Sequence, residues 1–141
     1  MEFELHPDLK RDGHILGSFP LSLLLLINDR RYPWFVLVPQ RAGIRELFEL
    51  TDLDYTQFCH ESKVFGQAIL SSFDGQKLNV AALGNMTPQL HIHHIVRYES
   101  DHAWPQPIWG QGPLEPYSTE EIRAVVSKLS RCKPEDLSLL A

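Results

Sequence analysis

The stretch Gln89-Leu90-His91-Ile92-His93-His94-Ile95-Val96 carries most of the information in this sequence. Hydrophobic and polar residues alternate along it, as they do in a β-strand whose two faces have different surroundings. A period of two places Gln89, His91 and His93 on one face. His94 points the other way, so we expect it in the core or at a subunit contact, with its ring hydrogen bonded.

Two imidazoles side by side on one strand face can divide the work of a reaction. Neutral imidazole is a nucleophile toward phosphorus, and its neighbour can handle a proton or a phosphate oxygen. The residues alone leave two other interpretations open: polar side chains on a solvated sheet face, or two zinc ligands. Zinc would need a third ligand, and the candidates follow on a loop (Glu99, Asp101 and His102). Because no cysteine or HExxH pattern accompanies the pair, we expect no metal.

The segments around this stretch predict an α+β fold in a single domain, residues 1–141. A periodic segment capped by Thr51 predicts one long helix at 51–73, and a capping-box pair, Ser118 and Glu121, opens a C-terminal helix that runs to residue 131. Pro134 suits a short final helix. Residues 1–13 predict only a turn at Asp12-Gly13. We expect about five antiparallel strands, at 14–19, 21–28, 35–38, 77–83 and 90–96, with the long helix packed on the sheet.

Composition excludes several classes of protein. The chain is 43% hydrophobic and 22% charged, as folded proteins are, and its net charge of −5 argues against a partner that is a nucleic acid. The most apolar run, 21–27, is too short to span a bilayer, so we expect no membrane association. The two cysteines, Cys59 and Cys132, form no disulfide pattern or CxxC motif, and no signal peptide is evident. We therefore expect a cytoplasmic protein.

The histidine strand resembles the signature of the histidine triad (HIT) superfamily, in which three histidines alternate with hydrophobic residues. The second and third histidines correspond to His91 and His93, whereas Gln89 stands in the first place, as in a bacterial branch of HIT-like proteins. The similarity extends over roughly residues 15–97. It includes Asn28 at a strand end, the segment Phe35-Val36-Leu37-Val38-Pro39-Gln40-Arg41, Asn79, and the turn Gly84-Asn85.

The resemblance implies a nucleotide-binding hydrolase or transferase that acts at the α-phosphate of a purine nucleotide conjugate. His91 would attack the phosphorus and form a covalent nucleotidyl-histidine, and His93 would contact phosphate oxygens. Gln89 can donate a hydrogen bond but cannot carry a positive charge or relay a proton. The alternative is therefore a nucleotide-binding module with little or no turnover.

The resemblance also implies further site residues and an assembly. The nucleotide would be bound by Asn28, Asn79, Gly84 and Asn85, without a cofactor, in a homodimer. The loop of residues 98–116, rich in proline and glycine, carries Trp104 and Trp109. These two rings could cover the pocket and stack on a base, but we favour a structural role for them.

Overall fold

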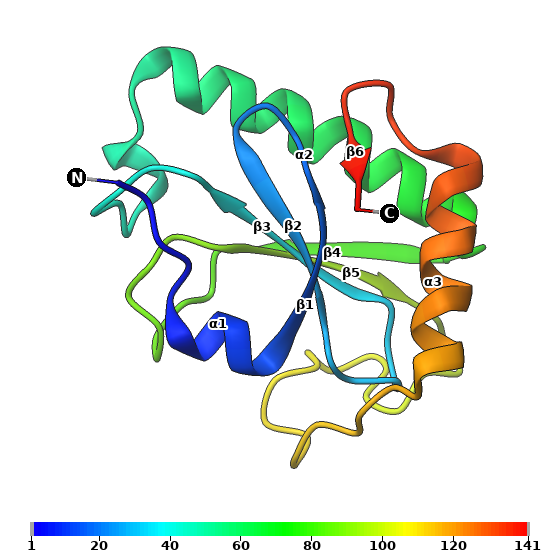
Figure 1. Ribbon diagram of the computed structural model, residues 1–141. Coiled ribbons are helices and arrows are strands. Elements are labelled where there is room, and N and C mark those ends of the chain that lie inside the picture. The colour runs from blue at the N-terminus through cyan, green and yellow to red at the C-terminus, as the bar shows by residue number, and fades with distance from the viewer. Residues whose placement is uncertain (1, 141) are drawn as a thin grey trace.

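One antiparallel sheet of six strands runs through the chain, in the order β4-β5-β3-β2-β1-β6 (Figure 1). The structure is a computed structural model and describes residues 2–140. It confirms the predicted α+β fold, with one strand more than expected. The strands are β1 (Gly13–Ser18), β2 (Ser22–Ile27), β3 (Trp34–Pro39), β4 (Lys77–Ala81), β5 (Ile92–Arg97) and β6 (Ser138–Leu139).

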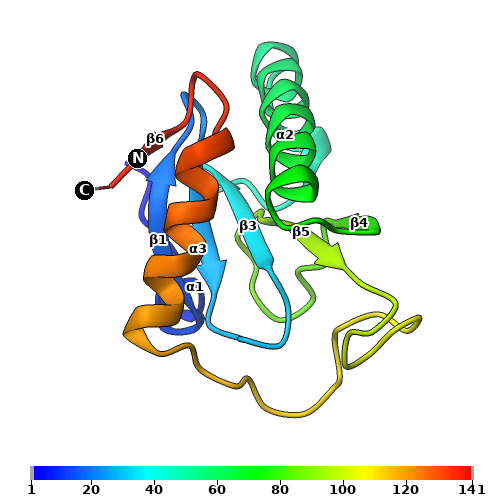
Figure 2. The same cartoon turned by 90° about the vertical axis from the view of Figure 1, so that its right-hand side faces the viewer.

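Within residues 2–140, four helical segments accompany the sheet: α1 (Pro7–Asp12), the 3-10 turn η1 (Leu47–Glu49), α2 (Asp52–Ser72) and α3 (Thr119–Cys132). Figure 2 shows the segment between β5 and α3 crossing below the sheet without a helix or strand, as predicted for 98–116. No helix in the part of the chain that the structure describes combines the length and apolar character needed to cross a bilayer.

Both faces of the sheet are covered, which explains the continuous apolar runs of β2 and β3. Leu24 and Leu26 point into a core shared with α2 and α3. Leu25 and Ile27 point into a second core on the other face, shared with Leu9 of α1 and with the loop after β5. The side chains of β5 therefore point into the first core on one face of the sheet and toward the second core on the other.

The predicted ends of the long helices are confirmed. The Thr51 hydroxyl accepts a hydrogen bond from the backbone N–H of Asp54 at 3.1 Å, at the start of α2. Ser118 and Glu121 form the expected capping box at the start of α3. In both cases side chains satisfy backbone N–H groups that have no partner within the helix.

Three local expectations were wrong. The predicted final helix at Pro134 is a turn that leads to β6, which pairs with β1; a Cβ at Gly17 would lie 2.2 Å from the Ser138 carbonyl oxygen, so this pairing requires a glycine. Residues Pro7–Asp12 form a helix that the sequence analysis missed. The strand expected at 90–96 begins at Ile92, so Gln89 and His91 precede it.

A buried carboxylate joins α2 to the turn between β1 and β2. Glu61 is fully buried and accepts hydrogen bonds from the backbone N–H groups of Leu21 and Ser22, at 2.8 and 3.1 Å, and from Gln57 at 2.8 Å. The turn also closes on itself, because Phe19 N–H donates to the Ser22 carbonyl. Glu61 thus connects the long helix to this turn by two hydrogen bonds, in addition to the apolar contacts that α2 makes with the sheet.

Replacing this side chain should destabilise the protein. Glu61→Ala leaves two buried backbone N–H groups without partners, and we expect the free energy of unfolding to fall by about 1–3 kcal/mol. Urea denaturation followed by circular dichroism measures the change. Lys63→Ala, at an exposed position of the same helix, is the matched control and should stay within about 0.5 kcal/mol. Equal effects of the two substitutions would contradict this account.

Candidate active site

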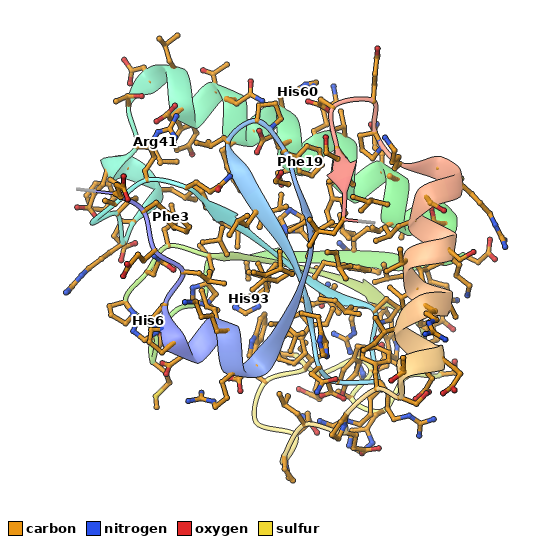
Figure 3. The ribbon with its side chains drawn as sticks, in the orientation of Figure 1. Phe3, His6, Phe19, Arg41, His60 and His93 are labelled. Carbon is orange, nitrogen blue, oxygen red and sulfur yellow. The ribbon has the colours of Figure 1, made fainter. Side chains whose placement is uncertain are left out.

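His91 and His93 lie side by side at the start of β5. Their ring centroids are 5.0 Å apart, and the two residues are 7% and 6% exposed. His93 is held in the middle of the sheet, opposite Val36 of β3 and Ala81 of β4 (Figure 3 labels His93). His91 precedes the strand and is therefore fixed mainly by its own hydrogen bond.

The hydrogen bond of His91 leaves one nitrogen free. Its Nδ1 lies 2.7 Å from the backbone carbonyl oxygen of Gln89, which can only accept, so Nδ1 carries the proton. Nε2 has no hydrogen-bond partner among residues 2–140, and its lone pair is available. Burial lowers the pKa of His91, the bond to the carbonyl opposes this, and the nearby His6 ring lowers it further, with a net decrease. His91 is therefore a neutral imidazole at pH 7 with an unprotonated Nε2.

His93 is neutral as well, but both of its nitrogens are occupied. The indole N–H of Trp34 donates to Nδ1 at 2.9 Å, so the proton is on Nε2, which donates to the Leu83 carbonyl at 2.9 Å. Burial is the main cause that lowers the pKa of His93 to about 4. In this geometry neither nitrogen is free for the phosphate contact expected of His93. The ring instead connects Trp34 to the turn that begins after Leu83.

His94 belongs to the core, as predicted. It is fully buried on the opposite face of β5, where the Ser62 hydroxyl donates to Nε2 at 2.7 Å and Nδ1 donates to the Ile92 carbonyl at 3.0 Å. Burial lowers the pKa of His94 to about 4. Both ring nitrogens of His94 thus have hydrogen-bond partners, and its role in this structure is that of a core residue.

A cavity of about 300 Å³ opens beside His91 and His93. This is at the lower end of the size range of small-molecule sites. Its walls come from α1, the end of β2, the start of β3, the turn before β5, and the loop after β5. They are mostly apolar, with two carboxylates from α1, and comprise Asp8, Leu9, Asp12, Ile27, Trp34, Leu83, Gly84, Asn85, Met86, Thr87, His91, His93, Trp109 and Leu114.

A second cavity of about 350 Å³ lies next to the first, and its lining is more polar. It is bordered by Arg45 and Glu46 on one side and by the segment 84–91 on the other. His91 lines both cavities, as do Gly84 and Asn85. His91 is thus placed at the junction of an apolar and a polar compartment.

Gly84 is required by its close approach to His91. A Cβ at this position would lie 2.9 Å from Cε1 of His91 and 3.2 Å from the Thr87 carbonyl oxygen. Its backbone is not in the left-handed region, so the turn by itself does not require glycine. The predicted pair Gly84-Asn85 is therefore brought to the histidines by the fold.

Asn28 and Asn79 line neither cavity. The Asn28 side-chain oxygen accepts from the Tyr117 backbone N–H at 3.0 Å, and that of Asn79 accepts from Arg97 at 2.8 Å. Gln89 borders the polar cavity, but its amide is hydrogen bonded to the backbone of Glu4 and His6. Of the four predicted nucleotide-binding residues, only Gly84 and Asn85 line the cavities together with His91.

The two tryptophans of the long loop have different surroundings. Trp109 borders the apolar cavity and packs edge-on against His93, with centroids 5.1 Å apart. Trp104 instead covers the guanidinium of Arg97 at 5.6 Å. Arg97 is buried and paired with Asp101 at 2.8 Å. Burial acts to raise the pKa of Asp101, but hydrogen bonds from Arg97 and from backbone N–H groups outweigh it, and the pKa is lowered.

Residues 2–140 contain no group of three or more His, Cys, Asp or Glu side chains placed to hold a metal ion. Both nitrogens of His93 are engaged, and Asp101, a candidate third ligand, is paired with Arg97. The zinc interpretation therefore has no ligand set in the described part of the chain.

Several site residues were missed by the sequence analysis. Asp8, Leu9 and Asp12 come from α1, a helix of six residues that is too short to show an apolar period. The available signal was Pro7 at the first helical position, with Asp8 in the first turn. Nothing in the sequence indicated that Trp34 belongs to the site, because it lies next to His93 only through the pairing of β3 with β5.

The chain is similar in sequence and fold to known proteins. The model of the HIT domain matches residues 9–100. A histidine triad protein from Marinobacter aquaeolei VT8 is 46% identical, with a TM-score of 0.91 over 94% of this chain and 96% of that one. Histidine triad proteins from Sinorhizobium meliloti 1021 and Bradyrhizobium japonicum are 42% and 38% identical, with TM-scores of 0.90 and 0.91; they cover 92% and 94% of this chain, and 96% and 98% of their own.

The fold is the one that these histidine triad proteins have, and in this chain it places His91 and His93 side by side. The chain belongs to the HIT domain family. HIT domain proteins are generally nucleotide-binding hydrolases or transferases. Among curated protein sequences, none matches the chain.

Nitrogen-15 NMR of the imidazoles tests the site geometry. We expect the proton on Nδ1 in His91 and His94 and on Nε2 in His93, and we expect His93 and His94 to stay neutral from pH 7 to pH 5 because their pKa values are about 4. In urea the same rings should titrate near 6.5. Since the unfolded chain then takes up protons first, stability should fall as the pH drops from about 6.5 to 4. Titration of either ring near 6.5 in the folded protein would refute the assignment.

Proposed function

We propose that this protein is a nucleotidyl hydrolase or transferase that acts at the α-phosphate of a purine nucleotide conjugate, with His91 as the nucleophile. The observation that carries the proposal is the free Nε2 of His91, a residue that lines both cavities while its Nδ1 donates to the Gln89 carbonyl. No cofactor is needed for this chemistry.

The reaction would proceed in two displacements. The Nε2 lone pair of His91 attacks the α-phosphorus, a P–N bond forms, and the bond to the leaving group breaks, the leaving group taking the electron pair and then a proton from solvent. Water or another acceptor then displaces His91 and loses a proton. The imidazole becomes cationic in the intermediate, and the Gln89 carbonyl at Nδ1–H stabilises that charge.

The two cavities would hold different parts of the substrate. The apolar one suits the nucleoside, with Trp109 offering an aromatic ring and Asp8 and Asp12 offering acceptors for hydroxyl groups. The polar one suits the leaving group, with Arg45 at its border. Asn85 lines both and would contact the phosphate. Asn28, whose N–H bonds the Asp12 carbonyl, would act by positioning α1.

Asn79 would also act indirectly in this scheme. Its side chain orients Arg97, which with Asp101 organises the loop that carries Trp109. A substitution at Asn79 would therefore change nucleotide binding only by altering the conformation of that loop.

The alternative function is a nucleotide-binding module with little or no turnover. One observation favours it: neither His93 nor Gln89 has a side-chain group free to protonate the leaving group. Under this alternative the pocket would bind AMP, and His91 would stay unmodified.

Single-turnover labelling decides between the two. The protein is mixed with an adenosine phosphoramidate, and separately with a dinucleoside polyphosphate, each labelled at the α-phosphate, then denatured rapidly. We expect label on the wild type, none on His91→Ala, and normal label on His102→Ala, an exposed loop variant. Absence of label and product, with AMP still bound in calorimetry, would contradict the enzyme and leave the binding module.

We also propose a homodimer of single-domain subunits in the cytoplasm. β4 is an edge strand of the sheet, and Val80 on it is 50% exposed, so a second copy could continue the sheet there. The thiols of Cys59 and Cys132 are both free and exposed, which suits a reducing compartment.

Sedimentation velocity tests the dimer. We expect twice the chain mass of 16.2 kDa for the wild type and a monomer for Val80→Lys, because a charge on the pairing edge opposes association. Ile15→Lys, at an exposed apolar position of β1, should remain dimeric. A wild-type monomer at micromolar concentration would overturn the assembly and leave the proposal for His91 untouched.

A further inference from the structure

The side chain of Gln89 is occupied at both ends by the backbone of the N-terminal segment. Its Nε2 donates to the Glu4 carbonyl at 2.8 Å, and its Oε1 accepts from the His6 N–H at 2.9 Å. The Glu4 carbonyl and the His6 N–H lie on either side of Leu5. In a β-sheet, two such groups would form hydrogen bonds with one residue of a neighbouring strand. The amide thus takes the place of a peptide group, and these two bonds fix its orientation toward the N-terminal segment.

The segment that Gln89 holds leads directly into the cavity wall. His6 caps α1, since its Nδ1 accepts from the Asp8 N–H at 3.0 Å, and α1 presents Asp8, Leu9 and Asp12 to the apolar cavity. Figure 3 labels His6 at the start of α1. A helix of six residues is not stable by itself, so its position depends on such attachments.

A second side chain supports the same attachment. The Thr87 hydroxyl donates to the Asp8 carboxylate at 3.0 Å, from the turn that also carries Gly84. Leu5 and Leu9 are buried beneath the segment, at 7% and 5% exposure. Apolar contacts therefore keep α1 on the sheet, whereas Gln89 and Thr87 set its position relative to His91.

We infer that Gln89 is a positioning residue, whose amide fixes α1 as a wall of the nucleotide cavity. This inference rests on the proposed function only in taking the ligand to be a nucleotide. An amide presents its donor and acceptor side by side, whereas the two nitrogens of an imidazole point away from each other, and a carboxylate has no donor. Neither histidine nor glutamate can make both bonds, so restoring the family's histidine at position 89 should weaken the site.

Hydrogen exchange of the free protein tests the attachment without any ligand. In Gln89→Glu and Gln89→His we expect amide exchange in residues 3–12 to quicken on the order of tenfold, since the hydrogen bonds lost are each worth close to that factor. Thr87→Val should act in the same direction. Gln76→Glu is the matched control, because the Gln76 amide oxygen accepts from the Glu99 N–H on a distant loop. Unchanged exchange in both Gln89 variants would overturn the inference.

Nucleotide assays then separate a positioning role from a phosphate contact. We expect Gln89→His and Gln89→Glu to raise the Kd for AMP and the KM several-fold while kcat at saturation stays near the wild-type value. A fall in kcat with unchanged Kd and exchange would assign Gln89 to the phosphate instead. If the wild type bound no AMP, the proposed function would fail, and the exchange result would still decide whether Gln89 holds α1.

Discussion

The site depends on the hydrogen bond between Nδ1 of His91 and the Gln89 carbonyl, at 2.7 Å. It fixes the tautomer, leaves the lone pair of Nε2 free, and would offer a negative dipole to the charge that develops in the proposed attack. Residue 89 thus orients the His91 ring through its backbone carbonyl and the N-terminal segment through its side-chain amide. A side-chain substitution there should change the cavity wall while the carbonyl stays in place.

A second chain of contacts fixes the remainder of the pocket. Trp34, buried on β3, donates to His93, and His93 donates to the Leu83 carbonyl at the beginning of the turn that includes Gly84. Only a neutral imidazole can accept at one nitrogen and donate at the other. His93 must therefore be neutral to bond Trp34 and Leu83 at once, which agrees with the lowering of its pKa by burial. Under the proposed function, His93 would act by shaping the cavity.

Much of the fold could be predicted from the sequence, because the strongest signals were local. The cap at Thr51, the box at Ser118 and the alternation around His91 each depend on neighbouring residues. What could not be predicted depended on long-range pairing: β6 pairs with β1 where Gly17 lies opposite Leu139, close to the Ser138 carbonyl. In the site, the alternation identified the histidines, but their partners could not be inferred, since hydrogen bonds such as that of Gln89 to Glu4 join residues 85 positions apart in the sequence.

A crystal structure of the protein with AMP bound would test the central claim most directly. The account predicts the nucleoside in the cavity between α1 and Trp109, with the phosphorus about 3–3.5 Å from Nε2 of His91. It also predicts that the Gln89 amide stays bonded to Glu4 and His6. A phosphate bound away from His91, or a Gln89 amide turned toward that phosphate, would contradict it.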